Sequence, residues 1–325
     1  MLAAGFGTRM RPLTNFVPKA LFPLLDRPLI AWTLDSLKQL GVDLAIVNLH
    51  HLGEKIRRAL GPQRGGVRIA YSWEPAILGT GGAVKKLATV LTSERHMLVI
   101  NSDCVFLDSL EGLVREHMVA EPLATLACAD SPEGAYTPIF ADDTKTIVGI
   151  GEHGTRGPHR LMFLGAHMIS ERIVDLFPEE SAFGIIDGAY VPALRTGGLR
   201  AWKYDGPWLD CGTIKLYLES SNFLLDHREL WPAEISKAIR TADDDLFICD
   251  DAKLESGCEL IPPVFVGRGA RVRNSTVGPY AVVGGGASVE NSTLKHGIVW
   301  PQTSIADQRL ERFIASPYAV VREES

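Results

Sequence analysis

The chain opens with the glycine-rich, basic stretch Leu2-Ala3-Ala4-Gly5-Phe6-Gly7-Thr8-Arg9-Met10-Arg11-Pro12-Leu13-Thr14 and continues with Val17-Pro18-Lys19-Ala20-Leu21. Gly5 and Gly7 allow the backbone to turn tightly and bring amide N–H groups close to a phosphate. Arg9, Arg11 and Lys19 add positive charge for the same anion. The spacing matches neither a Walker loop, which needs Gly-Lys-Ser/Thr after the glycines, nor a complete Rossmann fingerprint. These residues therefore predict a pocket for a triphosphate.

Short apolar runs alternate with amphipathic helical stretches over roughly the first 200 residues, which predicts an α/β fold with a mainly parallel sheet covered by helices. The expected strands are Leu44–Leu49, Val67–Trp73, Met97–Asn101, Leu123–Ala129 and Leu161–Met168, and the expected helices are Pro28–Leu40 and Gly53–Leu60. In such a fold, ligands gather at the carboxyl ends of the strands.

A repeat of 17 residues fills the C-terminal part of the chain. The apolar members of the repeat are Val266, Val272 and Val277, which recur as Val283, Val289 and Leu294. Successive apolar residues of the repeat lie five or six positions apart. This spacing suits a triangular solenoid of short parallel strands, in which Gly or Asn residues adopt the backbone conformation of the corners. The solenoid needs a cap at its end, and Asp307–Ile314 is expected to be a terminal helix that supplies one.

The alternating strand and helix pattern and the repeat predict two domains. These are an α/β domain over 1–230 and a solenoid with its terminal helix over 248–325, joined by a linker over 231–247. A chain of 325 residues with 46% hydrophobic content can bury one large core and a smaller second one. The net charge of -6 argues against a general nucleic-acid or anionic-membrane surface. Five scattered cysteines without CxxC spacing, and the lack of a signal or membrane-spanning run, predict a cytoplasmic protein with reduced thiols.

The combination GxGTRxxPLT (Gly5–Thr14) followed by PKAL (Pro18–Leu21) closely resembles the signature of the sugar-1-phosphate nucleotidyltransferases. The repeat unit resembles the left-handed β-helix that many of them append. The resemblance covers nearly the whole chain and implies a Rossmann-like catalytic domain followed by a short left-handed β-helix. It also implies an in-line displacement, in which a phosphate oxygen of a sugar 1-phosphate attacks the α-phosphorus of an NTP and pyrophosphate leaves. Such a reaction depends on positioning and electrostatic stabilisation and needs no covalent nucleophile.

The resemblance assigns catalytic roles to four residues. Arg9 would clamp the β- and γ-phosphates, and Lys19 would contact the α-phosphate and the attacking sugar phosphate. Mg²⁺ would be held by Asp103, in Asn101-Ser102-Asp103, and by Asp210, in Trp208-Leu209-Asp210-Cys211-Gly212-Thr213. These segments resemble the family motifs Asn-Gly-Asp and Trp-x-Asp-x-Gly-Thr. A lone Asp is more often a turn or cap residue, but the position of both on family motifs favours the metal role.

The resemblance further implies two sets of binding residues. The nucleotide-binding set is Leu2, Ala3, Ala4, Gly5, Gly7 and Thr8 together with Gly79, Thr80, Gly81 and Gly82. The second group belongs to a loop, Leu78–Ala83, that is expected to pack on the base and offer it backbone hydrogen bonds. The sugar-binding set is Glu152, at the place of a Glu-Lys-Pro motif, and Gly165, near an Asn-Ala-Gly motif.

The chain departs from the family pattern at three places. Ser102 replaces a glycine before the metal-binding Asp and would crowd the substrate phosphate if its hydroxyl pointed inward. Glu152 is followed by His153-Gly154 instead of Lys-Pro, which leaves the sugar open. Only Met1 precedes Leu2, where the family has several residues of its first strand. A central strand cut to a stub would leave ladder hydrogen bonds and apolar surface unmatched, so a start assigned too late is expected.

Three functions stay open at this point. A mannose-1-phosphate guanylyltransferase-like activity comes first, with GTP as the NTP. A uridylyltransferase that uses UTP and an N-acetylamino-sugar 1-phosphate is the close alternative, and a heptose or another hexose phosphate is a further substrate class. A non-catalytic relative that binds an NDP-sugar and regulates a partner is the third, but the presence of Arg9, Lys19, Asp103 and Asp210 favours an enzyme. Self-association through the β-helix is also expected.

Overall fold

The computed structural model describes residues 1–131, 134, 136–241 and 245–323. The chain divides into two compact units: unit 1 is Met1–Gly5 with Thr33–Trp208, and unit 2 is Phe6–Trp32 with Leu209–Ser325. This division differs from the boundary expected near residue 230, because the segment that follows Gly5 is grouped with the solenoid. The expected linker 231–247 also contains regular elements, and its residues 242–244 lie outside the described ones.

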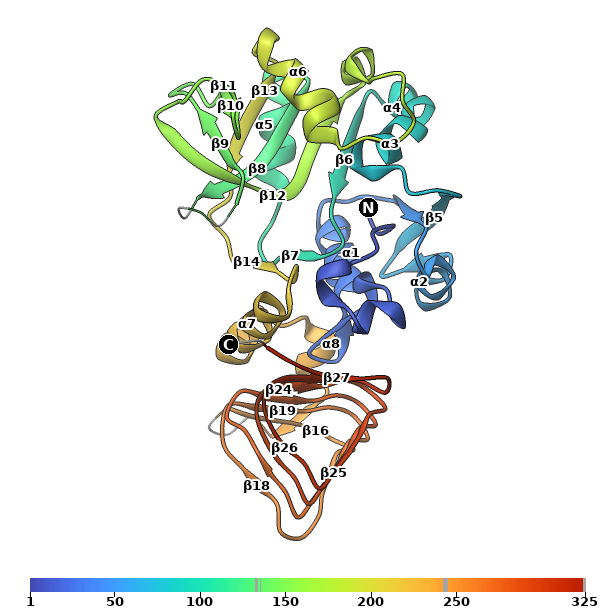
Figure 1. Cartoon of the computed structure of the whole chain (residues 1–325), viewed down its shortest axis with the longest axis vertical. Helices are drawn as coiled ribbons and strands as arrows, with labels where there is room; N and C mark the ends of the chain where they lie inside the picture. The colour runs from blue at the N-terminus through green and yellow to red at the C-terminus, as the bar shows by residue number, and fades with distance from the viewer. Residues whose placement is uncertain (132–133, 135, 242–244, 324–325) are drawn as a thin grey trace. The chain divides into compact units, whose positions relative to one another are not determined.

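Unit 1 contains a seven-stranded sheet and a three-stranded sheet (Figure 1). Its strands are β3 (Leu44–Leu49), β4 (Gln63–Arg64), β5 (Val67–Trp73), β6 (His96–Ile100), β7 (Cys104–Phe106), β8 (Ala124–Asp130), β9 (Pro138–Ala141), β10 (Ile147–Ile150), β11 (His153–Gly154), β12 (His159–Ser170) and β13 (Leu199–Lys203). The larger sheet has the order β11-β10-β9-β12-β8-β13, with β6 paired to β12, and the smaller has the order β3-β5-β4. The parallel pairing expected from the sequence holds for β3–β5 and β8–β13, whereas β12 runs antiparallel to β6, β8 and β9.

The described part of unit 1 contains a set of α-helices. They are α1 (Leu29–Gln39), which begins in unit 2, α2 (Gly53–Leu60), α3 (Gly79–Lys86), α4 (Ala88–Glu94), α5 (Glu111–Ala120) and the single turn α6 (Val191–Ala193). In α2 the buried residues Gly53, Ile56 and Leu60 share one face, and the helix ends at Gly61, whose φ of 65° suits glycine. Helix α5 packs against β8, β12 and β13 (Figure 1). A hydrophobic core cluster lies where the larger sheet meets α3, α4 and α6, and it includes Val84, Leu91 and Ala193.

Leu2 bridges the two sheets of unit 1. Leu2 forms parallel bridges both to Asn48 in β3 and to Asn101 directly after β6. The first residues therefore occupy the position of a central strand, but only for the length of this bridge.

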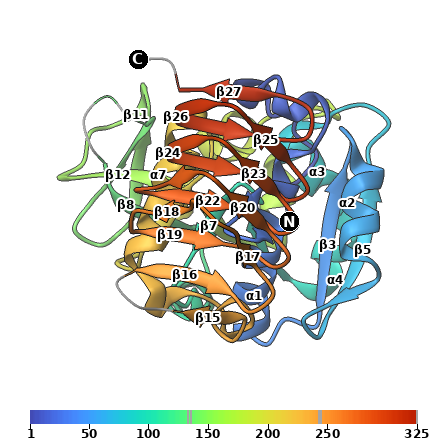
Figure 2. The ribbon, with the colours of Figure 1, turned by 90° about the horizontal axis from the view of Figure 1, so that it is seen from below.

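Unit 2 is dominated by a solenoid of about four turns. Its strands are β15 (Ile239–Thr241), β16 (Leu246–Cys249), β17 (Lys253–Leu254), β18 (Glu259–Leu260), β19 (Val264–Val266), β20 (Arg271–Arg273), β21 (Thr276–Val277), β22 (Ala281–Val283), β23 (Ser288–Glu290), β24 (Thr293–Val299), β25 (Ser304–Ala306), β26 (Arg309–Ala315) and β27 (Val320–Arg322). Figure 2 shows β16, β19, β22, β24 and β26 stacked in successive coils. The other elements of this unit are β1 (Pro23–Leu24), β2 (Arg27–Pro28), α7 (Ile214–Asp226) and α8 (Ala233–Ser236), while β14 (Trp208–Asp210) crosses the boundary.

The 17-residue repeat is confirmed as the pitch of the solenoid, because Val266 pairs with Val283 and Val272 with Val289. One corner is turned by asparagines in the left-handed region, as expected. Asn274 Nδ2 donates to Asn291 Oδ1 of the next coil at 2.9 Å, and Asn291 has a φ of 48°. The side-chain amides thus stack along the solenoid where the backbone bends.

The terminal helix predicted over Asp307–Ile314 is wrong. The segment contains most of β26, which pairs parallel with β24 and antiparallel with β27. Leu310 and Phe313 are buried in register with Leu294 and Gly297 of the preceding coil, so their spacing reflects the coil and not a helix. The end of the solenoid is therefore covered by an antiparallel strand.

Cys104, Cys128, Cys211 and Cys249 are buried, and Cys258 is partly exposed. Within the described residues, every helix is too short or too polar to cross a membrane.

His117 in α5 makes the stability of the fold sensitive to acid. Burial, followed by the nearby His96 ring, lowers the pKa of His117 from 6.5 to about 4. Because the folded-state pKa lies below the unfolded-state value, the unfolded chain takes up this proton first. The contribution of neutral His117 is complete above pH 6.5 and is lost as the pH falls toward 4, by on the order of 3 kcal/mol.

We expect urea unfolding to show this loss in the parent chain and His117→Gln to flatten that part of the stability curve. His159→Gln is the matched control, because the His159 side chain is 53% exposed. Parallel curves for the parent and His117→Gln would contradict the assignment.

Candidate active site

The site residues expected from the sequence divide between the two units. Unit 1 contains Leu2, Ala3, Ala4, Gly5, Gly79, Thr80, Gly81, Gly82, Asp103, Glu152 and Gly165, and unit 2 contains Gly7, Thr8, Arg9, Lys19 and Asp210. Each set has its own local geometry.

The backbone of Leu2 is held on both sides in unit 1. Its N–H donates to Ile100 O at 2.9 Å, and its carbonyl accepts from Ser102 N at 3.1 Å and from Ser102 Oγ at 2.8 Å. The Ser102 hydroxyl is therefore directed at the backbone of the opening segment. This contact answers the concern that the serine would crowd a substrate phosphate, because its side chain is already used to position Leu2.

A buried polar network connects the opening segment to the second glycine-rich segment. Ala3 N donates to Asn48 Oδ1 at 2.6 Å, and Asn48 Nδ2 donates to Glu74 Oε1 at 2.8 Å. The other carboxylate oxygen, Glu74 Oε2, accepts from Leu78 N at 3.1 Å. Glu74 is only 3% exposed, so these hydrogen bonds offset much of the cost of burying its carboxylate.

Sequence reasoning missed Asn48 and Glu74 as site residues. Asn48 interrupts the apolar run of β3, and Glu74 follows β5 directly. A polar side chain in a buried strand usually has a specific hydrogen-bond partner. That signal was available, but the identity of the partners depends on how β3 and β5 pair.

The segment Leu78–Ala83, expected to be a loop, instead forms the first turn of α3 from Gly79 onward. Gly81 N and Gly82 N both donate to Phe183 O, at 3.0 and 3.2 Å, and Thr80 Oγ1 accepts from Ile185 N at 2.9 Å. The backbone groups of Gly81 and Gly82 expected to meet a base thus bond to another part of unit 1. A Cβ on Gly81 would lie 2.2 Å from the Phe183 ring, which explains the glycine.

Gly165 lies beside the segment that ends in Asp103. Asn101 N donates to Gly165 O at 2.8 Å, and a Cβ on Gly165 would lie 2.9 Å from Asn101 Nδ2. Gly165 has a φ of 88° and lies within the register shift of β12, a feature that often occurs beside functional sites. Unit 1 therefore brings Gly165 next to the strand end that carries Asp103.

Glu152 occupies a different position in unit 1. It is exposed in the tight turn between β10 and β11. In pairing order, β9 and β12 separate β10 from β6, so the sheet does not place Glu152 beside Asp103.

The first turns of unit 2 are fixed around Gly7. Gly7 has a φ of 59°, and its carbonyl accepts from Thr14 Oγ1 at 3.0 Å. A Cβ at this position would lie 2.8 Å from Thr14 Cγ2 and 3.5 Å from Lys19 Cβ. Both the backbone conformation and the close packing therefore require glycine. Lys19 begins the short turn Lys19–Leu21 and is 9% exposed.

Arg9 and Asp210 come together at Gly212 in unit 2. Gly212 N donates to Asp210 Oδ1 at 2.7 Å, which holds the carboxylate at the end of β14. A Cβ on Gly212 would lie 2.8 Å from Asp210 Oδ1 and 3.2 Å from Arg9 Nη2. The carboxylate and the guanidinium thus lie against the same glycine, and Thr213 Oγ1 caps α7 beside them by accepting from Leu216 N.

The donor set suits an ion that is completed by substrate. Among the residues that the structure describes, no three His, Cys, Asp or Glu side chains gather as a metal site. Mg²⁺ is commonly held by one or two protein carboxylates, with phosphate and water oxygens as its other ligands. Asp103 in unit 1 and Asp210 in unit 2 each offer a single carboxylate of this kind.

Glu74→Gln tests the buried network. One acceptor oxygen becomes an NH₂ group, which must face either the Asn48 amide or the Leu78 N–H. We expect the free energy of unfolding to fall by about 1–3 kcal/mol and nucleotide affinity to fall with it. Urea unfolding and equilibrium nucleotide binding measure the two effects.

Glu54→Gln is the matched control for this variant. The Glu54 carboxylate accepts hydrogen bonds from Arg57 and Arg58 on the exposed face of α2, and exposed pairs of this kind stabilise a fold little. Equal effects for the two variants would show that Glu74 does not position the loops.

Comparison with known proteins places the chain in a family. The family model for nucleotidyl transferase matches residues 1–227. The chain is 26% identical to a UTP–glucose-1-phosphate uridylyltransferase of Synechocystis sp., over 86% of this chain and 82% of that protein. It is 31% identical to an N-acetylmuramate alpha-1-phosphate uridylyltransferase of Neisseria meningitidis, over 66% of this chain and 92% of that protein. It is 26% identical to a mannose-1-phosphate guanylyltransferase of Mycobacterium tuberculosis, over 85% and 76%.

Solved structures share the fold at lower identity. HddC from Yersinia pseudotuberculosis aligns with a TM-score of 0.58 at 20% identity, covering 69% of this chain and 97% of that chain. A UDP-glucose pyrophosphorylase from Acinetobacter baumanii aligns with a TM-score of 0.60 at 18% identity, covering 71% and 94%. Since the family model matches more than half of this chain, the chain belongs to the nucleotidyl transferase family.

Proposed function

We propose that this protein transfers a nucleotidyl group from an NTP to a sugar 1-phosphate and releases pyrophosphate. The observation that carries the proposal is the meeting of Arg9 and Asp210 at Gly212, a cation and a carboxylate held on the signature motifs of the matched family. Relatives over most of the chain carry names for this reaction with different nucleotides and sugars.

In the proposed reaction, the protein aligns and neutralises anions. Arg9 attracts the β- and γ-phosphates that leave as pyrophosphate, and Lys19 contacts the α-phosphate and the incoming sugar phosphate. The Leu2–Gly5 backbone, fixed by Ser102 and Asn48, positions the nucleotide. Mg²⁺, held by Asp103 and Asp210, would supply further neutralisation of the phosphate oxygens. Preorganised charges of this kind lower the barrier without reorganising during the reaction.

For the substrates, we propose GTP and mannose 1-phosphate, with UTP and an N-acetylamino-sugar 1-phosphate as the alternative. The first pair is supported by guanylyltransferase relatives that align over about 85% of the chain. The second is supported by the 31% identity to the N-acetylmuramate alpha-1-phosphate uridylyltransferase. The proposal also includes a cytoplasmic location and self-association through the solenoid.

A substrate panel tests the activity. Pyrophosphate release is measured with GTP, UTP, ATP and dTTP, each with mannose, glucose, N-acetylglucosamine and heptose 1-phosphates and Mg²⁺. We expect GTP with mannose 1-phosphate to exceed other pairs in kcat/KM by at least about tenfold, because the base and sugar pockets hydrogen-bond one partner best. Preference for UTP would select the alternative. Binding of an NDP-sugar without turnover of any pair would select the regulatory function.

Asp103→Asn and Asp210→Asn test the metal assignment. Each variant keeps the shape of the side chain and removes its charge, so kcat should fall by on the order of a thousandfold while the melting temperature changes little. Asp143→Asn is the control, because the Asp143 side chain is 88% exposed and bonds to His159. Near-normal turnover in both test variants would exclude the metal role.

A further inference from the structure

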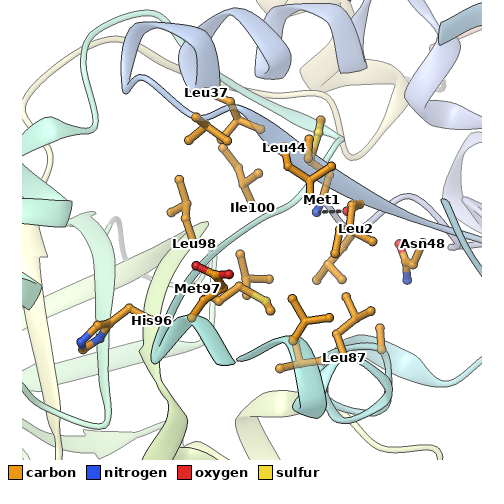
Figure 3. A pocket seen from close by; sticks show the side chains of 18 of the residues that line it. Met1, Leu2, Leu37, Leu44, Asn48, Leu87, His96, Met97, Leu98 and Ile100 are labelled. Carbon is orange, nitrogen blue, oxygen red and sulfur yellow. Dashed lines mark hydrogen bonds between the residues drawn. The ribbon is translucent and has the colours of Figure 1, made fainter. Parts of the chain in front are cut away.

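The opening segment of the chain divides between the two units. Met1 and Leu2 lie in unit 1, where they line a cavity of about 440 Å³ (Figure 3). The stretch Phe6–Trp32, which carries Lys19, belongs to unit 2 together with Leu209–Ser325. Lys19 therefore lies in the same compact unit as the solenoid.

A short hairpin follows the turn Lys19–Leu21. Its strands β1 and β2 pair antiparallel, and at its open end Leu29 N donates to Phe22 O at 3.0 Å. Phe22 N donates in turn to Lys19 O at 2.9 Å. The backbone of Lys19 is therefore tied to Phe22, which lies at the base of the hairpin.

The solenoid binds the tip of this hairpin through Asp26. Gly285 N donates to Asp26 Oδ1 at 2.7 Å, and Arg268 N donates to Asp26 Oδ2 at 3.3 Å. Arg268 and Gly285 lie one repeat apart, so they occupy the same place in successive coils. A Cβ on Gly267 would lie 2.3 Å from Asp26 Oδ2. The close approach of the carboxylate therefore requires glycine at this corner of the solenoid.

Three buried aromatic rings meet at the base of the hairpin, and we call Phe22, Tyr217 and Trp300 the aromatic cluster. The ring centroid of Phe22 lies 4.6 Å from that of Trp300, with an interplanar angle of 62°. It lies 5.8 Å from that of Tyr217. The Tyr217 hydroxyl donates to Pro23 O in β1. Phe22 thus contacts both Tyr217 of α7 and Trp300, which directly follows β24 of the solenoid.

Helix α7 links the aromatic cluster to Asp210. Ser220, three positions after Tyr217 in α7, donates from its Oγ to Asp210 O at 3.2 Å. Residues at this spacing are neighbours on one face of a helix. Helix α7 also packs against β24 and β26 of the solenoid (Figure 1). The backbone of Asp210 is therefore tied to the helix that carries Tyr217.

We propose that the solenoid holds both Lys19 and Asp210 in place for the reaction, and that Trp300 is the positioning residue through which it does so. Trp300 fixes Lys19 through Phe22, and it fixes Asp210 through Phe22 and Tyr217. The inference rests on the proposed function, in which Lys19 and Asp210 contact the phosphates and the metal. Close-packed rings leave their neighbours few alternative positions. A misplacement of about 1 Å can lower a rate by on the order of a hundredfold.

The test compares Trp300→Leu, Trp300→Phe and Val289→Ala in the full chain. Val289 is the matched control, because it is also buried in the solenoid but lies in the separate four-stranded sheet. Trp300→Leu opens a space beside Phe22, so kcat should fall by at least about tenfold while KM for the NTP changes less than about twofold. Trp300→Phe should restore most of the kcat. Val289→Ala should lower the melting temperature and leave kcat unchanged well below it.

Amide hydrogen exchange, resolved by residue, reports the same positions without turnover. The Phe22 N–H bonds to Lys19 O, and the Gly212 N–H bonds to Asp210 Oδ1. Both should exchange at least about fivefold faster in Trp300→Leu than in Val289→Ala. Asp26→Ala is a second variant that leaves the aromatic cluster filled. It should speed exchange at Phe22 and leave Gly212 unchanged, because Asp26 contacts the hairpin tip and not α7.

Equal exchange at Phe22 and Gly212 in Trp300→Leu and Val289→Ala would overturn the inference. A kcat in Trp300→Leu equal to that of the parent chain would overturn it as well. A parent chain that turns over no pair of substrates would instead contradict the proposed function. The exchange rates would then still decide whether Trp300 holds Lys19 and Asp210 in place.

Discussion

The geometry of unit 1 depends on the parallel pairing of Leu2 with β3 and β6. This pairing joins the three-stranded sheet to the seven-stranded one, and it fixes the start of the glycine-rich segment. Ser102 holds the Leu2 carbonyl from one side, and Asn48 holds the Ala3 N–H from the other. Asn48 also donates to Glu74, and the other carboxylate oxygen of Glu74 accepts from Leu78 N at the start of α3. The opening segment and the start of α3 are thus both held by hydrogen bonds to their backbone groups. A preorganised binding site requires fixed positions of this kind.

Local sequence patterns were sufficient for much of the fold. The bounds of β3, β5 and α2 agree with those expected, because β3 and β5 are apolar runs and α2 is an amphipathic helix that ends before Gly61. The solenoid was predictable from its repeat, since stacked coils need the same residue types in register. The segment over β26 was misread because Leu310 and Phe313 have a spacing that also suits a helix. Only their pairing with the preceding coil decides for a strand, and that pairing is not local.

The candidate site shows the same limit. Gly7, Arg9 and Asp210 could be identified from motifs. In the structure Gly7 packs against Thr14, and Arg9 and Asp210 both pack against Gly212. The contacts of Gly81 and Gly82 with Phe183 could not be identified, because about a hundred residues separate the partners and no motif marks Phe183. The sequence of α3 contains three glycines and so resembles a loop. Long-range packing, which the sequence does not encode locally, made it a helix.

The location of a bound metal tests the central claim most directly. Crystals grown with the nucleotide and Mn²⁺, which scatters anomalously, report the position of the ion independently of turnover. The account predicts one anomalous peak within about 2.5 Å of a carboxylate oxygen of both Asp103 and Asp210, in contact with the nucleotide phosphates. A nucleotide bound through its phosphates, with the metal contacting neither carboxylate, would contradict it.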